Sequence, residues 1–156
     1  MSSTLLEATV AAADSPEPRF LIDNSVWARL AIEPTVRAAF EALIIANRPS
    51  SILICPPVAA EYGFSARNGV EHTRMMESLS AFTECDESPK SAQVLAVQNA
   101  LWNAGLVRAA GAMDTIIAAY AILSEATVVH YDRDYELIGG AVPQLRHQWI
   151  VPRGSI

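Results

Sequence analysis

The sequence is poor in lysine and cysteine and has no glycine-rich nucleotide-binding pattern. Lys90 is the single lysine beside ten arginines, which excludes a P-loop with its Gly-Lys-Ser/Thr ending and most lysine nucleophiles. The seven glycines form no GxGxxG pattern, so a dinucleotide-binding fingerprint is excluded too. Cys55 and Cys85 end two apolar segments and fit no CxxC or Cys/His spacing. They predict buried reduced thiols rather than a zinc site.

Long hydrophobic runs are also absent, and the net charge is negative. The apolar runs are far shorter than the ~20 residues of a membrane span, and the first residues lack the basic start of a secretory signal. We therefore expect a cytoplasmic protein without membrane contact. The net charge of −6 argues against a nucleic-acid partner, because phosphate contacts demand a basic surface. Such contacts would depend on a basic partner or on these arginines: Arg29, Arg67, Arg74, Arg108, Arg133 and Arg146.

Length and composition predict one globular domain. The 156 residues are enough for a single core and too few for two comfortable ones. A hydrophobic content of 51% with 18% charged residues is typical of a folded chain. Residues 1–18 end in Ser15-Pro16-Glu17-Pro18 and are predicted to be a weakly structured N-terminal extension. Residues 19–156 are expected to form the domain.

Short apolar segments alternate with helical patterns along this domain. Strands are predicted at residues 19–23, 51–55, 81–85, 126–131 and 146–151. Helices are predicted after Asn24, from Pro34 to Asn47, at 58–67, after the separating Gly69 through residues 75–79, at 88–105, from Asp114, and at 132–138, where Gly139-Gly140 ends the last one. This alternation, without tight hairpins, predicts a single three-layer α/β domain. Its central, mainly parallel sheet of four to five strands would carry helices on both faces.

Four acidic residues lie where a strand or turn gives way to a helix: Asp23, Glu61, Asp114 and Asp132. Ligand sites in parallel sheets form at the carboxyl ends of the strands, so we expect the fold to gather these acids at that edge. Four negative charges in a small volume are unstable unless a hard cation neutralises them. Carboxylate-bound Mg²⁺ or Mn²⁺ would indicate phosphodiester chemistry.

Each acid also has a simpler structural explanation. Asp114 could cap the helix that follows, a contribution worth ~1 kcal/mol, and Asp132 and Asp134 could be acids stabilised by a helix dipole. Asp23 resists such an explanation, because a carboxylate that continues a buried strand is costly unless it is bonded. Glu61 is similarly conspicuous within a mostly apolar helix. The conjunction of all four acids in this order favours a metal site.

Two other phosphate-handling folds place an aspartate after their first strand, and both fit less well. A haloacid-dehalogenase-like phosphatase needs a second aspartate where this chain has Ser25, and a later lysine that Lys90 is poorly placed to supply. A phospho-acceptor receiver domain needs an additional acidic pair and a lysine near its fourth strand.

The histidines and tryptophans have no obvious catalytic setting. No histidine is placed for a Ser/His/Asp triad. His130 lies on an apolar strand and is predicted to be a core residue, whereas His72 and His147 are predicted to lie at the surface. Trp27 and Trp102 lie on helical stripes and are predicted to be in the core.

Four segments of the chain together resemble a known family: FLIDNSVW, PPVAAEYGFSAR, AMDTIIAAYAI and VVHYDRDYELI. In this order and spacing they resemble the signature segments of the PIN domain. More narrowly, they resemble the toxin nuclease of a VapBC-type type II toxin–antitoxin pair. The resemblance covers residues 19–150. It implies a parallel sheet with an acidic pocket that holds Mg²⁺ or Mn²⁺. The implied activity is endoribonuclease cleavage of single-stranded or loop regions of cellular RNA, such as tRNA or rRNA.

The resemblance also assigns roles to individual residues. It implies that Asp23, Glu61, Asp114 and Asp132 are the catalytic, metal-binding acids, with Ser25 as the small hydroxyl residue and Asp134 as an accessory acid. Apart from this resemblance, Arg108 could reach a substrate phosphate from the loop before Asp114, or it could be solvated.

The expected partners follow from the same resemblance. They are RNA, a VapB-like antitoxin that covers the acidic pocket, and a second copy of the chain in a homodimer formed through helices flanking residues 75–79. The alternative is a PIN-like module that has lost catalysis and acts only by binding a partner. The four intact acids argue against this alternative.

Overall fold

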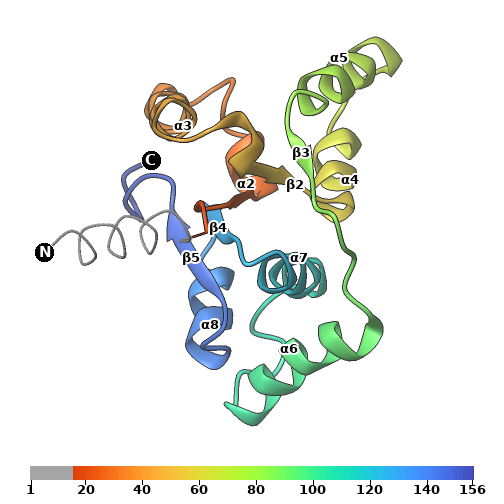
Figure 1. The fold of residues 1–156 in the computed structure, drawn as a ribbon, viewed down its shortest axis with the longest axis vertical. Helices are drawn as coiled ribbons and strands as arrows, with labels where there is room; N and C mark the ends of the chain where they lie inside the picture. The colour runs from red at the N-terminus through yellow and green to blue at the C-terminus, as the bar shows by residue number, and fades with distance from the viewer. Residues whose placement is uncertain (1–15) are drawn as a thin grey trace, which may run out of the picture.

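The computed structural model describes residues 16–156 of the chain. The predicted extension at residues 1–18 therefore lies outside the described residues, apart from its last three. Pro16, Glu17 and Pro18 have no regular secondary structure. From Phe20 onward, helices alternate with strands to the end of the chain (Figure 1).

Five parallel strands form one sheet in the order β3-β2-β1-β4-β5. The strands are Phe20–Ile22 (β1), Ile52–Ile54 (β2), Thr83–Glu84 (β3), Thr127–His130 (β4) and Arg146–Trp149 (β5). The central strand β1 has β2 and β4 as neighbours, and its Leu21 and Ile22 are fully buried. A strand covered on both faces needs a continuous apolar run, which the sequence supplies. The predicted parallel α/β architecture is confirmed.

Helices cover the sheet on both sides. They are Asn24–Trp27 (α2), Pro34–Ala46 (α3), Pro56–Phe64 (α4), Gly69–Leu79 (α5), Ser91–Asn103 (α6), Ala112–Leu123 (α7) and Asp134–Ala141 (α8), with a 3₁₀ turn at Pro49–Ser51 (η1). Helices α6, α7 and α8 contact one another on one side of the sheet, whereas α2 and α3 lie on the other side (Figure 1). Within residues 16–156, no helix combines the length and the apolar character that crossing a membrane requires.

Two helices begin differently from the prediction. Helix α4 starts at Pro56, because prolines at the first helical positions lose no hydrogen bond that the helix needs. Helix α7 starts at Ala112, with Gly111 in the capping position. Asp114 is therefore the third residue of α7 and not its cap, so the capping explanation for this acid is wrong.

The prediction that Gly139-Gly140 ends the last helix is also wrong. Helix α8 continues to Ala141. A Cβ atom at position 139 would lie 2.8 Å from Cδ2 of His147, so the imidazole of strand β5 occupies the space that a side chain would need. Here the glycine permits a close helix–strand contact instead of terminating the helix.

Trp27 lies in the core, as predicted, at the centre of a cluster of aromatic side chains. Its side chain is 5% exposed, and its ring centroid lies 5.3 Å from that of Phe40 and 5.2 Å from that of Phe82. Its indole Nε1–H donates a hydrogen bond of 3.1 Å to the Ile22 carbonyl. This bond ties α2 to the end of β1, the strand that leads into Asp23.

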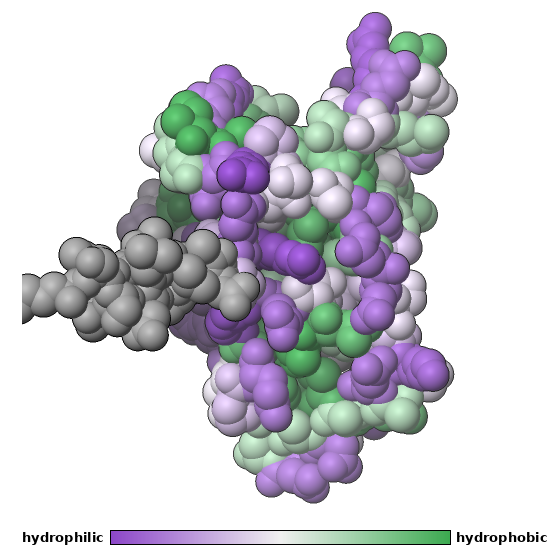
Figure 2. Space-filling view, viewed as in Figure 1, coloured by the Kyte–Doolittle hydropathy of each residue, from purple (hydrophilic) through white to green (hydrophobic). Residues whose placement is uncertain are grey.

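Some large apolar side chains are exposed, among them one that was predicted to be in the core. Trp102 is 42% exposed, so its assignment to the core is wrong, and Met76 on α5 is 60% exposed. An apolar groove of about 590 Å³ lies between α6, α7 and α8. In Figure 2 this region shows as hydrophobic surface, separated by hydrophilic surface from a second hydrophobic area over α3.

Trp27→Phe is expected to lower the free energy of unfolding by about 1–3 kcal/mol, because it removes a buried hydrogen bond and leaves unfilled space. Urea denaturation followed by circular dichroism measures this change. Trp102→Phe is the matched control and should stay within about 0.5 kcal/mol of the original protein, since Trp102 is partly exposed. Equal losses in the two variants would contradict the core role of Trp27.

Candidate active site

Local structure brings the predicted acids to the carboxyl edge of the sheet. Asp23 directly follows β1 and caps α2, and Asp132 lies in the turn between β4 and α8. Asp134 is the first residue of α8, and Asp114 lies in the first turn of α7. Because β1 and β4 are adjacent parallel strands, their carboxyl ends open onto the same space.

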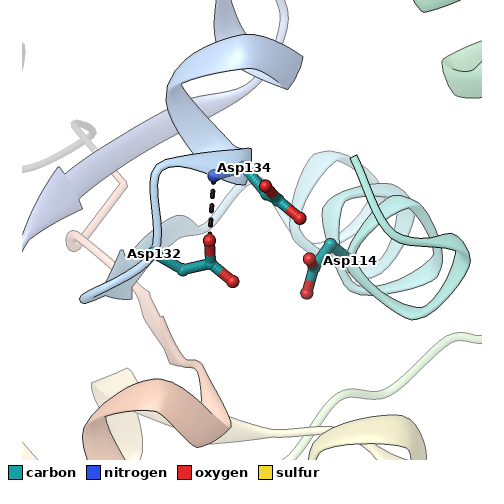
Figure 3. Close-up of side chains that lie close together, drawn as sticks. All are labelled: Asp114, Asp132 and Asp134. Atoms are coloured by element: carbon teal, nitrogen blue, oxygen red, sulfur yellow. Dashed lines mark hydrogen bonds between the residues drawn. The ribbon is translucent and has the colours of Figure 1, made fainter. Parts of the chain in front are cut away.

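Asp114, Asp132 and Asp134 form the tightest group of acids. One oxygen from each lies within 4.8 Å of the others, and the three carboxylates point into a common space (Figure 3). The Asp134 N–H donates to Oδ1 of Asp132 at 3.0 Å, and the Gly111 N–H donates to Oδ2 of Asp134 at 3.2 Å. The backbone thus fixes two of the carboxylates. Asp134, predicted only as an accessory acid, lies within this group.

Asp23 is linked to the group through a tyrosine. Asp23 is 3% exposed, and its Oδ2 accepts the Ser25 N–H at 2.9 Å. The Tyr135 hydroxyl lies 2.6 Å from Oδ1 of Asp23 and 3.3 Å from Oδ1 of Asp114. One buried phenol therefore joins the acid after β1 to the acid on α7.

Tyr135 is a site residue that the sequence analysis missed. It is fully buried, and burial, followed by the charges of Asp23 and Asp114, holds the pKa of its phenol well above the usual range. It therefore stays protonated and can donate. The available signal was its position three residues after Asp132, on the inner side of a helix that begins with acids.

Glu61 approaches the same pocket from α4. Burial is the main cause that raises the pKa of its carboxyl, and the charges of Asp23 and Asp132 raise it further. Glu61 is half-buried and lies outside the three-acid group.

Neither the Ser25 hydroxyl nor the Arg108 side chain forms a hydrogen bond with the acids in the described part of the chain. The Ser25 hydroxyl accepts the Tyr131 N–H at 2.9 Å, so only its backbone reaches Asp23. Arg108 is exposed and has a left-handed backbone with φ of 57°. Among residues 16–156, no hydrogen bond or ion pair connects Arg108 to these acids, and its role as a phosphate ligand stays a prediction.

The acids hold more negative charge than the site can accommodate without compensation. The pKa of Asp114 is raised to about 8, first by burial, then by its hydrogen bond with Asp134, and then by the charges of Asp23 and Asp132. Burial also raises the pKa of Asp132. The shared field therefore favours either a retained proton or a bound cation.

A pair of histidines supports the loop that carries Asp132. His130 is fully buried, as predicted, and its Nδ1 accepts the Asp132 N–H at 3.1 Å. Burial lowers the pKa of His130 to about 3, so the ring is neutral and its remaining proton is on Nε2. This proton is donated to Nδ1 of His147 at 2.9 Å. His147 is half-buried, so only part of its side chain is at the surface, as predicted for a surface group.

The donor set fits a hard divalent cation. Carboxylate oxygens suit Mg²⁺, Mn²⁺ and Ca²⁺, whereas zinc and softer metals prefer imidazole or thiolate ligands. The raised pKa of Asp114 records an excess of negative charge that such a cation would offset. The roles of individual acids as ligands stay predictions.

Comparisons with known proteins agree with this geometry. The family model described as "PIN domain" matches residues 20–141. The chain belongs to the PIN domain family. Ribonuclease VapC51 of Mycobacterium tuberculosis is 37% identical over 139 residues, which cover 88% of this chain and 97% of that protein.

Solved structures share the fold of this PIN domain. VapBC2 from Rickettsia felis, bound to a promoter DNA fragment, matches with a TM-score of 0.66 and 20% identity over 83% of this chain and 97% of that one. A toxin–antitoxin complex from Klebsiella pneumoniae matches with a TM-score of 0.55 and 19% identity over 80% and 93%. At these identities the likeness confirms the architecture.

The raised pKa of Asp114 predicts how the stability of the metal-free protein depends on pH. Unfolded aspartate, with a pKa of ~3.9, is ionised at neutral pH, whereas folded Asp114 retains its proton up to a pKa of about 8. The folded state then binds more protons, so the contribution of Asp114 to stability falls as the pH rises toward and through 8.

Thermal unfolding in EDTA at about pH 6 and 8.5 tests this dependence, with Asp114→Asn as the comparison. The variant should gain stability relative to the original protein as the pH rises, because it carries no ionisable group at this position. His130 and Cys55 are present in both proteins, so their titrations cancel in the difference. Parallel changes in both melting temperatures would contradict the raised pKa.

Proposed function

We propose that this PIN domain is the toxin of a type II toxin–antitoxin pair and acts as a divalent-metal-dependent endoribonuclease. The observation that carries the proposal is the convergence of Asp23, Asp114, Asp132 and Asp134 at one edge of the sheet. The relative named Ribonuclease VapC51, which this chain matches over nearly its whole length, supports RNA as the substrate. Single-stranded or loop regions of tRNA or rRNA are the proposed targets.

In this proposal, Asp114, Asp132 and Asp134 hold Mg²⁺ or Mn²⁺, and Asp23 provides a fourth carboxylate. When bound, the cation supplies charge that stabilises the developing phosphate transition state and acidifies a water molecule. The Ser25 N–H and the Tyr135 hydroxyl each use one lone pair of Asp23, leaving others available. These bonds hold the carboxylate in place before any ligand arrives.

We propose that Glu61 acts on the water molecule that attacks the phosphodiester. It lies outside the three-acid group but faces the charges of Asp23 and Asp132. Its raised pKa makes it a better proton acceptor than an ordinary carboxylate, which suits a general base. Glu61 would orient the water and accept its proton as the phosphodiester bond breaks.

The proposed partners are an antitoxin and a second copy of the chain. Support for an antitoxin comes from the similar structure from Klebsiella pneumoniae, which is a toxin–antitoxin complex. The acidic cluster would accept a basic side chain of such a partner. For the homodimer, the helices flanking residues 75–79 remain the proposed contact, and the exposure of Val70 (65%) and Met76 (60%) on α5 supports it.

Asp114→Asn is expected to reduce Mn²⁺-dependent RNA cleavage at least about 100-fold. Removing a residue that hydrogen-bonds to a metal ligand already lowers metal affinity or activity about 10–100-fold. Removing a ligand itself should lower activity by at least the upper end of that range. Cleavage of total RNA by purified, partner-free protein, with and without EDTA, measures the effect. Asp86→Asn changes an exposed acid outside the cluster and should retain activity. Absence of cleavage by the unmutated protein would favour the inactive-module alternative.

Tyr135→Phe is expected to weaken Mn²⁺ binding about 10-fold or more, because it removes the hydroxyl that orders Asp23 and Asp114. Isothermal titration calorimetry measures this affinity without any need for RNA. Tyr120→Phe is the matched control, since Tyr120 is also buried but its hydroxyl donates to Ser88 at 3.2 Å. If both variants bind Mn²⁺ as tightly as the original protein, Tyr135 does not position the acids.

A further inference from the structure

Arg29, between α2 and α3, has a guanidinium group that is fixed at the rim of the acidic cluster. Its Cζ atom lies 4.9 Å from the centroid of the Tyr131 ring, a cation–π contact. One terminal nitrogen donates to the Ser25 carbonyl at 2.7 Å. These two contacts hold the group in place but leave most of its five N–H donors available.

Arg29 is also one of the arginines that form no ion pair in the described part of the chain. Ion pairs within residues 16–156 are formed by Arg48, Arg67 and Arg153. Over the same residues, Arg29 has no carboxylate oxygen within 4.0 Å, although it belongs to a chain with a net charge of −6. The positive charge of Arg29 is therefore fixed in position, and no carboxylate of residues 16–156 neutralises it through an ion pair.

The Tyr131 ring, on which the Arg29 guanidinium packs, is next to the active site. Tyr131 immediately precedes Asp132, and its N–H donates to the hydroxyl of Ser25. Arg29 donates to the carbonyl of Ser25, whose own N–H donates to Oδ2 of Asp23. Arg29 is thus close enough to influence the acids without forming a salt bridge to them.

A row of aromatic and basic groups continues away from the acids. The Trp149 ring meets Tyr131 edge-on at a centroid distance of 5.2 Å, and the guanidinium of Arg153 lies 5.9 Å from the Trp149 centroid. We call Arg29, Tyr131, Trp149 and Arg153 the cation–aromatic row. Grooves that bind single-stranded nucleic acids combine the same two kinds of group, cations for the backbone and aromatic surfaces for the bases.

We propose that the cation–aromatic row binds the RNA strand beside the cleavage point, with Arg29 contacting the phosphate next to the one at the acidic cluster. This inference rests on the proposed ribonuclease function and extends it to a substrate-binding surface. A cation at the rim offsets part of the charge of the acids and also attracts an anionic ligand that approaches beside them. The planar guanidinium can bind a phosphate through two hydrogen bonds.

The cation–aromatic row also explains how a protein with a negative net charge can bind RNA. Each phosphate contact contributes through local charge and the release of counterions, and does not require a positive net charge. Arg153 is already paired with Glu136 at 3.0 Å, so Arg29 is the cation of the row that is available without breaking an ion pair. Arg29 should therefore contribute most to binding.

Binding of a short single-stranded RNA, followed by fluorescence anisotropy at several salt concentrations, tests the proposal. Every protein carries Asp114→Asn so that the RNA stays intact. Arg29→Gln should weaken binding several-fold and reduce the slope of log K against log salt by about 0.7, the value for one lost phosphate contact with a single strand. Arg29→Lys should keep the slope but lose part of the affinity, because it keeps the charge without the planar group.

Arg37→Gln is the matched control. Arg37 also donates to backbone carbonyls, those of Leu30 at 2.9 Å and Ala31 at 3.2 Å, but it is exposed and no interaction connects it to the acids within the described chain. Its substitution should leave the affinity and the slope unchanged. Equal effects of Arg29→Gln and Arg37→Gln would overturn the proposal. If double-stranded RNA binds equally tightly, the proposed preference of the row for single-stranded RNA is wrong.

Steady-state cleavage without the Asp114 substitution separates substrate binding from catalysis. Arg29→Gln should raise KM about tenfold and change kcat by less than about twofold, since the residue holds substrate outside the reacting bonds. A fall in kcat with unchanged KM would show that Arg29 acts through Asp132, and would overturn the proposal. If the unmutated protein cleaves no RNA but still binds it with an Arg29-dependent slope, the proposed nuclease function fails and the binding surface stands.

Discussion

Repulsion among carboxylates is the constraint on which the rest of this site depends. The parallel sheet places Asp23 and Asp132 at the ends of adjacent strands, and α7 and α8 add Asp114 and Asp134. Such a group cannot stay fully ionised in partial burial without compensating charge. The fold supplies part of the compensation itself, through backbone N–H groups, the Tyr135 hydroxyl and the nearby cation of Arg29. A divalent cation would supply the remainder.

The sequence was sufficient to predict the parts of this design that follow from local patterns. A short apolar run that ends in an acid identifies β1 and Asp23, because a buried parallel strand leaves few polar positions and each must be satisfied. The same reasoning located β4 and the acids after it. The parallel architecture also followed, since alternating strands and helices favour parallel neighbours, whereas the order β3-β2-β1-β4-β5 came only from the structure.

The features that escaped prediction depend on contacts between distant segments. Gly139 reads as a helix terminator until His147 from β5 is seen to fill the space beside it. Tyr135 looks like an ordinary core residue, and only the fold places its hydroxyl between Asp23 and Asp114. Trp102 lies on a regular helical stripe, yet its helix is at the edge of the domain. Periodicity reveals which side of a helix is apolar, but it does not reveal what that side meets.

The charge of the whole chain was the least informative quantity, and the structure explains why. A net charge of −6 counts acids that are concentrated at one edge, where they serve as ligands for positive charge. Interactions between exposed charges are screened beyond about 8–10 Å, so a phosphate that approaches the rim responds mainly to the nearest groups. One arginine held on an aromatic ring, without a carboxylate partner in the described chain, then matters more than acids elsewhere on the surface. In an acidic nuclease, the position of a few fixed cations decides where the RNA backbone can lie.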